Sequence, residues 1–168
     1  MSNRAVVLRE LHELMEAEDK SNSYGVDYWN GNDNDPYHWE ITMIAPKDSL
    51  YEGGYFKLEA KLSEKYPEFP PAIKFLTRIY HCNIGKDDGY ICINILNEWK
   101  KNYCMEHLLN NLIILLYRQN AEHPTNYEMK DEYNNKRSQF EANAREWVKK
   151  YANINNYENT NNFYSYLP

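Results

Sequence analysis

Apolar residues recur along this chain with two different periods, and each change of period marks a predicted element. From residue 4 to 17 they fall at helical spacing, which predicts an amphipathic helix: Val7, Leu8, Leu11, Leu14 and Met15. Further on they alternate with polar residues in two runs, as in half-buried strands: Trp39, Ile41 and Met43, then Phe56, Leu58, Ala60 and Leu62. Pro46 and the pair Gly53-Gly54 lie between the two runs and predict the turn of a hairpin.

The remaining elements complete an α+β pattern. A short strand is expected at 24–29, and a last strand at 73–76 follows the prolines at 70 and 71. Helical spacing returns at 105–117, which is apolar on most sides and is predicted to be the buried central helix, and again at 130–151. We therefore predict an N-terminal helix, a four-stranded antiparallel meander, an irregular loop at 77–101 and C-terminal helices.

The length and the position of these elements indicate a single domain followed by a tail. The chain has 168 residues, enough for one domain with a substantial core. We assign residues 1–152 to this domain. Residues 153–168 are rich in asparagine and tyrosine and show no period, so we expect a flexible tail there.

Charge and cysteine content narrow the function. The formal net charge of -6 argues against a nucleic-acid binder. The longest apolar stretch, at 108–116, is too short to cross a membrane, and the first residues lack the apolar region of a secretion signal. Three irregularly spaced cysteines do not form a disulfide framework. We expect an intracellular protein of the cytoplasm, the nucleus or both, where a thiol stays reduced.

The irregular loop contains the candidate chemistry. Its sequence has a turn at 81–83, formed by His81, Cys82 and Asn83, and then a cysteine with apolar neighbours, Cys92. Several motifs surround this pair in a fixed order: Tyr51-Glu52-Gly53-Gly54, Tyr66-Pro67-x-x-Pro70-Pro71, Ile95-Leu96, Trp99 and Asn120-x-x-x-Pro124. Together they resemble the ubiquitin-conjugating enzyme family, in which a His-Pro-Asn motif precedes the active cysteine. The resemblance covers residues 4–152.

This resemblance implies a cysteine-dependent transferase that needs no cofactor. Cys92 would accept ubiquitin or a ubiquitin-like modifier as a thioester from an activating enzyme, in an ATP-dependent pathway, and pass it to a substrate lysine or to a ligase. Asn83 would donate to the oxyanion of the transition state or brace the loop that shapes it. His123 and Asn94 occupy positions where relatives place groups that could orient or deprotonate the lysine. They are candidates for this role, ranked behind Cys92 and Asn83.

The chain also departs from the family pattern. Cys82 replaces the proline of His-Pro-Asn, which removes a fixed φ angle from the turn. On the expected ligase-binding surface, Glu68 stands where many relatives carry phenylalanine, with Phe69 beside it. After Trp99, Lys100, Lys101 and Asn102 replace a Ser-Pro-Ala loop, so a ligase would meet non-standard contacts.

On the predicted first helix, Arg4 and Arg9 are candidates for binding an acidic activating enzyme, although Glu10, Glu13 and Glu16 dilute this positive charge.

Three other interpretations of the same residues remain. A catalytically silent relative would bind ubiquitin or a partner as a scaffold, although such variants lack the active cysteine. A cysteine hydrolase would pair Cys92 with His123 or His81, but no hydrolase signature surrounds the cysteine. A zinc site from His81, Cys82 and Cys92 lacks the close C-x-x-C spacing of structural zinc. Cys82, Cys104 and His81 are read as structural residues.

Overall fold

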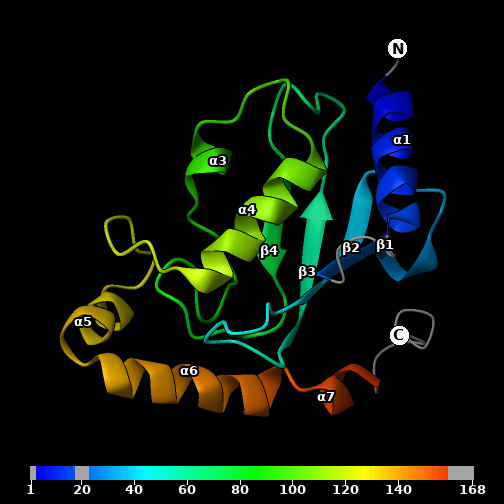
Figure 1. The fold of residues 1–168 in the computed structure, drawn as a ribbon. Helices are drawn as coiled ribbons and strands as arrows, with labels where there is room; N and C mark the ends of the chain where they lie inside the picture. Colours follow the sequence, from blue (N-terminus) through cyan, green and yellow to red (C-terminus); the bar gives the residue numbers. More distant parts are fainter. Residues whose placement is uncertain (1–2, 18–22, 159–168) are drawn as a thin grey trace.

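The structure of this chain is a computed structural model that describes residues 3–17 and 23–158. The described part contains, in order, α1 (Asn3–Glu16), β1 (Tyr24–Tyr28), the short 3₁₀ helix η1 (Trp29–Gly31), β2 (His38–Ile44), β3 (Tyr55–Lys61), β4 (Ala72–Phe75), α3 (Asn94–Asn97), α4 (Met105–Tyr117), α5 (Tyr127–Asn135), α6 (Arg137–Tyr151) and α7 (Ile154–Glu158). Figure 1 shows α4 crossing in front of β3 and β4, with α1 beside the sheet and α6 along its lower end.

The sheet is the predicted antiparallel meander, with strand order β1-β2-β3-β4. The apolar residues of the two alternating runs face each other in register: Trp39 opposite Ala60, Ile41 opposite Leu58 and Met43 opposite Phe56. All six of these side chains are completely buried. The alternation at 39–62 therefore places one face of the sheet in the core, as period-two patterning requires.

Helix α4 lies against the core along one face. Its buried residues are Met105, Leu108, Leu109, Leu112, Leu115 and Leu116. Ile114 and Tyr117 are more than half exposed, at 59% and 53%. The prediction of a central helix at 105–117 is confirmed in its bounds, but the helix is buried on one side rather than on most sides.

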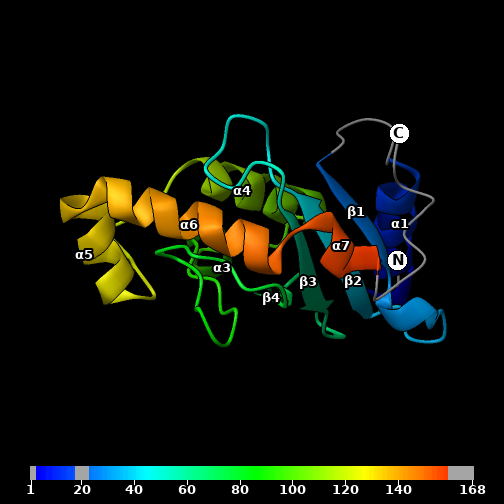
Figure 2. The same ribbon diagram turned by 90° about the horizontal axis from the view of Figure 1, so that it is seen from below.

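The predicted helix at 130–151 is wrong in one respect, because two helices occupy this region. The first, α5, begins at Tyr127, where the side chain of Asn126 accepts a hydrogen bond from the backbone N–H of Met129 and caps the helix. Lys136 then leaves the helical conformation, with φ −138° and ψ 52°, and α6 starts in a new direction. Figure 2, seen from below, shows α6 running from α5 toward α7.

Two short α-helices were not predicted. Helix α3 follows Cys92 inside the segment predicted to be irregular, and α7 lies in the first part of the segment predicted to be a tail. The end of α6 is fixed to the sheet, because the backbone N–H of Tyr55 donates to the carbonyl of Ala152 at 2.8 Å and Ala152 is buried. Residues 159–168 of the predicted tail lie outside the described residues.

Candidate active site

The segment from β4 to Cys92 is fixed by buried apolar anchors. Ile79, Ile84 and Ile91 are at most 2% exposed, and the short bridges between Ile84 and Ile91 and between Lys74 and Tyr90 hold the loop against the sheet edge. Between Ile84 and Ile91, residues 85–89 form a turn in which the backbone N–H of Gly89 donates to the carbonyl of Gly85. Gly89 has φ +68°, and a Cβ there would lie 1.8 Å from the carbonyl oxygen of Phe75. Glycine is therefore required three residues before Cys92.

His81 is a buried, neutral imidazole that shapes the turn. Its Nε2 lies 2.9 Å from the carbonyl oxygen of Leu115 on α4, and its Nδ1 accepts the backbone N–H of Asn83 at 3.0 Å. The Nε2 nitrogen must therefore carry the proton. Burial lowers the pKa of His81 to about 4. With both nitrogens engaged, His81 has neither a free lone pair for a metal nor access to a substrate.

Asn83 is completely buried and holds the loop between α4 and α5. Its Nδ2 donates to the carbonyl oxygens of Asn120, at 2.7 Å, and His123, at 2.9 Å. Its Oδ1 accepts the backbone N–H of Asn120 at 2.8 Å. Both amide hydrogens are therefore used inside the protein, which is the geometry of a loop brace rather than of a donor aimed at a substrate.

Cys92 lies directly beside this braced turn. Its backbone N–H donates to the carbonyl of Asn83 at 2.9 Å, so the two residues are joined through the main chain. Unlike the completely buried His81, Cys82 and Asn83, Cys92 is partly exposed. Asn94, two residues later, is exposed and is the first residue of α3. The structure thus presents one accessible thiol against a rigid buried turn.

Cys82 does not compete with this thiol. Its side chain is completely buried, and burial raises its pKa to about 11, so the thiol stays protonated at neutral pH. Its carbonyl accepts hydrogen bonds from the backbone N–H groups of Thr125 and Asn126 and from the Thr125 hydroxyl. Cys104 is partly exposed at the start of α4, where its Sγ lies 2.9 Å from His107 Nδ1.

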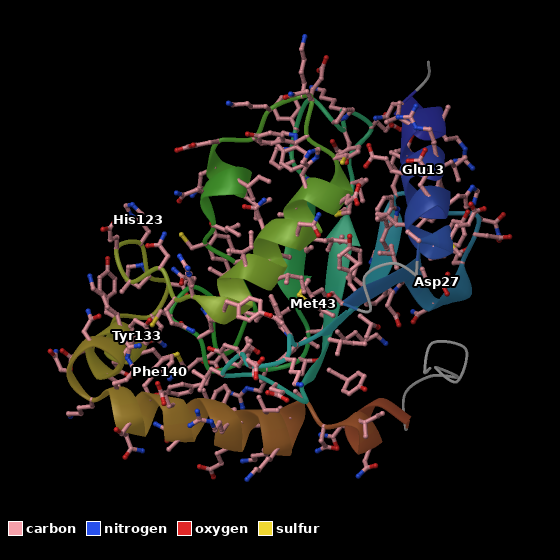
Figure 3. All side chains as sticks on the ribbon, in the orientation of Figure 1. Glu13, Asp27, Met43, His123, Tyr133 and Phe140 are labelled. Carbon is pink, nitrogen blue, oxygen red and sulfur yellow. The ribbon has the colours of Figure 1, made fainter. Side chains whose placement is uncertain are left out.

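His123 lies on the loop that Asn83 braces. Figure 3 shows it on the segment between α4 and α5. It lies apart from the contact between the rings of Tyr133 and Phe140, which joins α5 to α6. Its side chain is exposed, and its carbonyl is one of the two that Asn83 holds. The turn at 81–83 therefore fixes the backbone position of His123.

The predicted partner-binding residues lie on exposed segments. Glu68 and Phe69 follow β3, and Phe69 is 53% exposed. Lys100 and Lys101 are exposed on a loop that is tied to the first, because Trp99 Nε1 donates to the carbonyl of Pro67 at 2.8 Å. These four residues therefore belong to two neighbouring loops.

The two arginines lie on the exposed side of α1. Arg4 is exposed, and Arg9 lies 3.7 Å from the Glu13 carboxylate one turn along the helix.

The structural roles of two residues were missed by the sequence analysis. The Gln119 side chain accepts the backbone N–H of Cys82 at 2.8 Å. The buried carboxylate of Glu10 on α1 accepts the Tyr66 hydroxyl at 2.6 Å and the first N–H of α4 at 3.1 Å. The only sequence signal for Gln119 was the loss of proline at 82, which leaves an N–H that needs an acceptor. The spacing of Glu10 was a usable signal, because it lies three residues after Val7 and four before Leu14, on the buried face of α1.

No group of three or more histidine, cysteine, aspartate or glutamate side chains within 3–17 and 23–158 is arranged to hold a metal ion. Over the same residues, no helix combines the length and the apolar character needed to cross a membrane.

Comparisons with known proteins identify the family of this chain. A sequence model of the ubiquitin-conjugating enzyme family matches residues 7–148. A probable ubiquitin-conjugating enzyme E2 31 of Arabidopsis thaliana is 38% identical over 123 residues, which cover 73% of this chain and 79% of the plant protein. The chain therefore belongs to the ubiquitin-conjugating enzyme family.

Solved structures show the same fold. The domain of a ubiquitin conjugating enzyme from Toxoplasma gondii superposes with a TM-score of 0.79 at 27% identity, covering 88% of this chain and 98% of that one. A Plasmodium yoelii protein described as a ubiquitin conjugating enzyme gives the same TM-score and identity and covers 89% of this chain and 94% of its own. Both structures support the α+β fold predicted from the sequence.

Proposed function

We propose that Cys92 carries ubiquitin, or a ubiquitin-like modifier, as a thioester and transfers it to a lysine of a substrate or to a ligase. The observation that supports this proposal most directly is the partial exposure of Cys92 next to the buried turn at 81–83 in a chain of this family. A thiolate is both a strong nucleophile and a good leaving group, which a carrier of an acyl group requires.

The proposed reaction has two steps. The Cys92 thiolate attacks the carbonyl carbon of the modifier's C-terminal thioester on the activating enzyme and displaces that enzyme's thiolate. A neutral lysine amine then attacks the same carbon, the tetrahedral oxyanion collapses, and Cys92 leaves as a thiolate. The amine proton passes to a base. His123 and Asn94 are our candidates for handling the lysine: His123 would orient or deprotonate it, and the neutral amide of Asn94 would orient it.

We assign Asn83 the role of a brace. Its three hydrogen bonds to the main chain of Asn120 and His123 support this assignment, because they fix the loop beside the thioester. Asn83→Ala would free this loop, so discharge of the thioester to free lysine should slow at least ~10-fold while charging of Cys92 changes less than about threefold.

The partners follow from the family and the exposed surfaces. We propose that Arg4 and Arg9 on α1 meet the activating enzyme, and that the neighbouring loops with Glu68, Phe69, Lys100 and Lys101 meet a ligase. Phe69 supplies an exposed apolar contact, and Lys65 lies over its ring at 5.7 Å from the centroid. We place this reaction inside the cell, in the cytoplasm or nucleus, with no cofactor bound to the chain.

A charging assay tests the proposal. The protein is mixed with an activating enzyme, ATP and ubiquitin and analysed on reducing and non-reducing gels. A thiol-sensitive band heavier by one ubiquitin is expected for the parent and for Cys104→Ala, the matched control at the other partly exposed cysteine. It is expected to be absent in Cys92→Ala. If no ubiquitin-like modifier gives this band with its own activating enzyme, the catalytically silent alternative is correct.

A further inference from the structure

Cys82 stands where the family has proline, so the turn at 81–83 contains a backbone N–H that a proline would lack. Cys82 has an N–H, and the residue is completely buried, so water cannot satisfy this donor. A buried N–H without an acceptor would favour a different turn conformation, and it would do so one residue before Asn83. The chain therefore needs an acceptor at this point.

Gln119 supplies that acceptor from the segment after α4. Its Oε1 accepts the Cys82 N–H at 2.8 Å, and its Nε2 donates to the Tyr51 hydroxyl at 2.8 Å. The Tyr51 hydroxyl in turn donates to the carbonyl of Tyr80 at 2.6 Å. Because the only Tyr51 hydroxyl hydrogen is used on Tyr80, this hydroxyl must accept from Gln119. This fixes which end of the glutamine amide faces Cys82.

The position of Gln119 links this contact to the brace described above. The next residue, Asn120, exchanges hydrogen bonds with the Asn83 side chain through both its N–H and its carbonyl. The side chain of residue 119 and the main chain of residue 120 therefore hold two consecutive residues of the turn. Tyr51 is completely buried and its ring stacks on His81, with centroids 5.7 Å apart, so the far end of the Gln119 contact is rigid as well.

We propose that Gln119 is a positioning residue that replaces the restraint of a proline at 82. By holding the Cys82 amide, it keeps Asn83 in place against the 120–123 loop beside Cys92. This inference deepens the proposed transfer reaction and rests on it for its kinetic consequence. The hydrogen-bonding arrangement itself is independent of that reaction.

The test compares Gln119→Leu in chains with and without an N–H at position 82. In the parent chain, Gln119→Leu should slow discharge of the Cys92 thioester to saturating lysine about tenfold and change charging less than twofold. In a Cys82→Pro chain, which has no N–H to satisfy, the same change should slow discharge less than twofold. In a Cys82→Ala chain, which keeps the N–H but lacks the thiol, the tenfold effect should return.

Gln139→Leu is the matched control, because Gln139 is the only other glutamine of the chain and is exposed on α6. It should leave both rates unchanged. Equal slowing by Gln119→Leu in the parent and in the Cys82→Pro chain would overturn the proposal, since it would show that Gln119 acts through general stability. No slowing in either chain would overturn it as well.

Hydrogen exchange gives a readout that needs no activity and no proline variant. The Cys82 amide should exchange at least tenfold faster in Gln119→Leu than in the parent, while the amides of β2 keep their protection. Unchanged exchange at Cys82 would rule out the contact. If the parent fails to form any thioester, the proposed function is wrong, and the exchange experiment still decides whether Gln119 holds the turn.

Discussion

At the scale of single residues, the site depends on polar side chains that are buried without a charge. His81 and Asn83 are completely buried, and the structure gives each of them main-chain partners that lie far away in sequence. Asn83 contacts residues 37 and 40 positions further on, and His81 contacts Leu115, which is 34 positions further on. Such groups are tolerated in a core because every donor and acceptor is satisfied.

The low pKa of His81 makes stability depend on pH. The folded protein holds this imidazole neutral, with a pKa of about 4, because burial disfavours the charged form. An unfolded chain takes up the proton below about pH 6.5, so this contribution is complete above that pH and is lost progressively as the pH falls toward 4. Between pH 7 and pH 5 it should lower the free energy of unfolding by about 2 kcal/mol.

Urea unfolding of the parent and of His81→Gln at both pH values measures this effect. The variant should be less stable than the parent at pH 7, but the drop between pH 7 and pH 5 should be smaller by about 2 kcal/mol. If the free energy of unfolding falls equally in the two proteins between pH 7 and pH 5, another group causes the acid sensitivity.

The sequence indicated which residues are candidates for the site, but it did not indicate which groups surround each of them. The motif order was enough to single out Cys92 and Asn83. It left open whether Asn83 donates to a substrate or braces a loop, because that depends on the carbonyls of Asn120 and His123, which only the folded chain brings to it. The loss of proline at 82 indicated that an acceptor was needed, but only the folded chain shows that Gln119 supplies it.

At the scale of elements, local spacing predicted most of the fold. The two alternating runs became β2 and β3, and 105–117 became α4 with the same bounds. The break at Lys136 was not predicted because the apolar spacing continues through it, to Phe140 and Ala144, both completely buried on α6. In the structure the two helices pack against each other, with the ring centroids of Tyr133 and Phe140 5.1 Å apart.

The turn at 85–89 requires a glycine at position 89. In Gly89→Ala, the new Cβ would clash with the carbonyl of Phe75 on β4, at a φ angle that alanine rarely adopts. We expect a loss of roughly 2–5 kcal/mol in the free energy of unfolding, as strain and overpacking add. Chemical denaturation measures it.

Gly31 provides the control for Gly89. It also has a positive φ, but a Cβ there would have nothing within 4 Å, so Gly31→Ala should lose only the conformational part, about 1–2 kcal/mol. Equal losses in the two variants would show that the close approach to Phe75 is not decisive.

The segment between β4 and the turn at 81–83 contacts the C-terminal helices through the Tyr80 hydroxyl. Tyr80 donates to the Glu132 carboxylate on α5 at 2.5 Å, and Asn143 on α6 donates to the same carboxylate at 3.2 Å. Burial and the neighbouring carboxylate raise the pKa of Tyr80 to about 12, so the hydroxyl keeps its proton at neutral pH.

Tyr80→Phe removes this hydroxyl and keeps the ring packing. It should cost about 1–2 kcal/mol, because Glu132 loses its strongest donor in a partly buried position. Thermal unfolding measures the change. Tyr127→Phe, at a tyrosine of α5 that is 75% exposed, should be neutral, and a similar loss in both variants would contradict the assignment.

At the scale of the whole molecule, the C-terminal part of the chain closes the fold. Helix α6 runs along the lower side of the molecule, and its end returns to the sheet, as Figures 1 and 2 show. The contact is made by Ala152, which is buried and whose carbonyl accepts the N–H of Tyr55 at the start of β3. The domain boundary after residue 152, which the sequence predicted from the loss of periodicity, stays a prediction.

Truncation tests where the domain ends. A chain that stops at Glu158 should match the full chain in melting temperature and in charging of Cys92, because it keeps the contact at Ala152. A chain that stops at Tyr151 loses the buried methyl group and leaves the Tyr55 N–H without its acceptor, which should cost about 1–3 kcal/mol. For a domain of this size, that lowers the melting temperature by roughly 3–10 °C. Equal melting temperatures for the two truncated chains would show that the return of α6 to the sheet adds nothing to stability. A loss already present in the chain ending at Glu158 would move the boundary of the domain beyond residue 158.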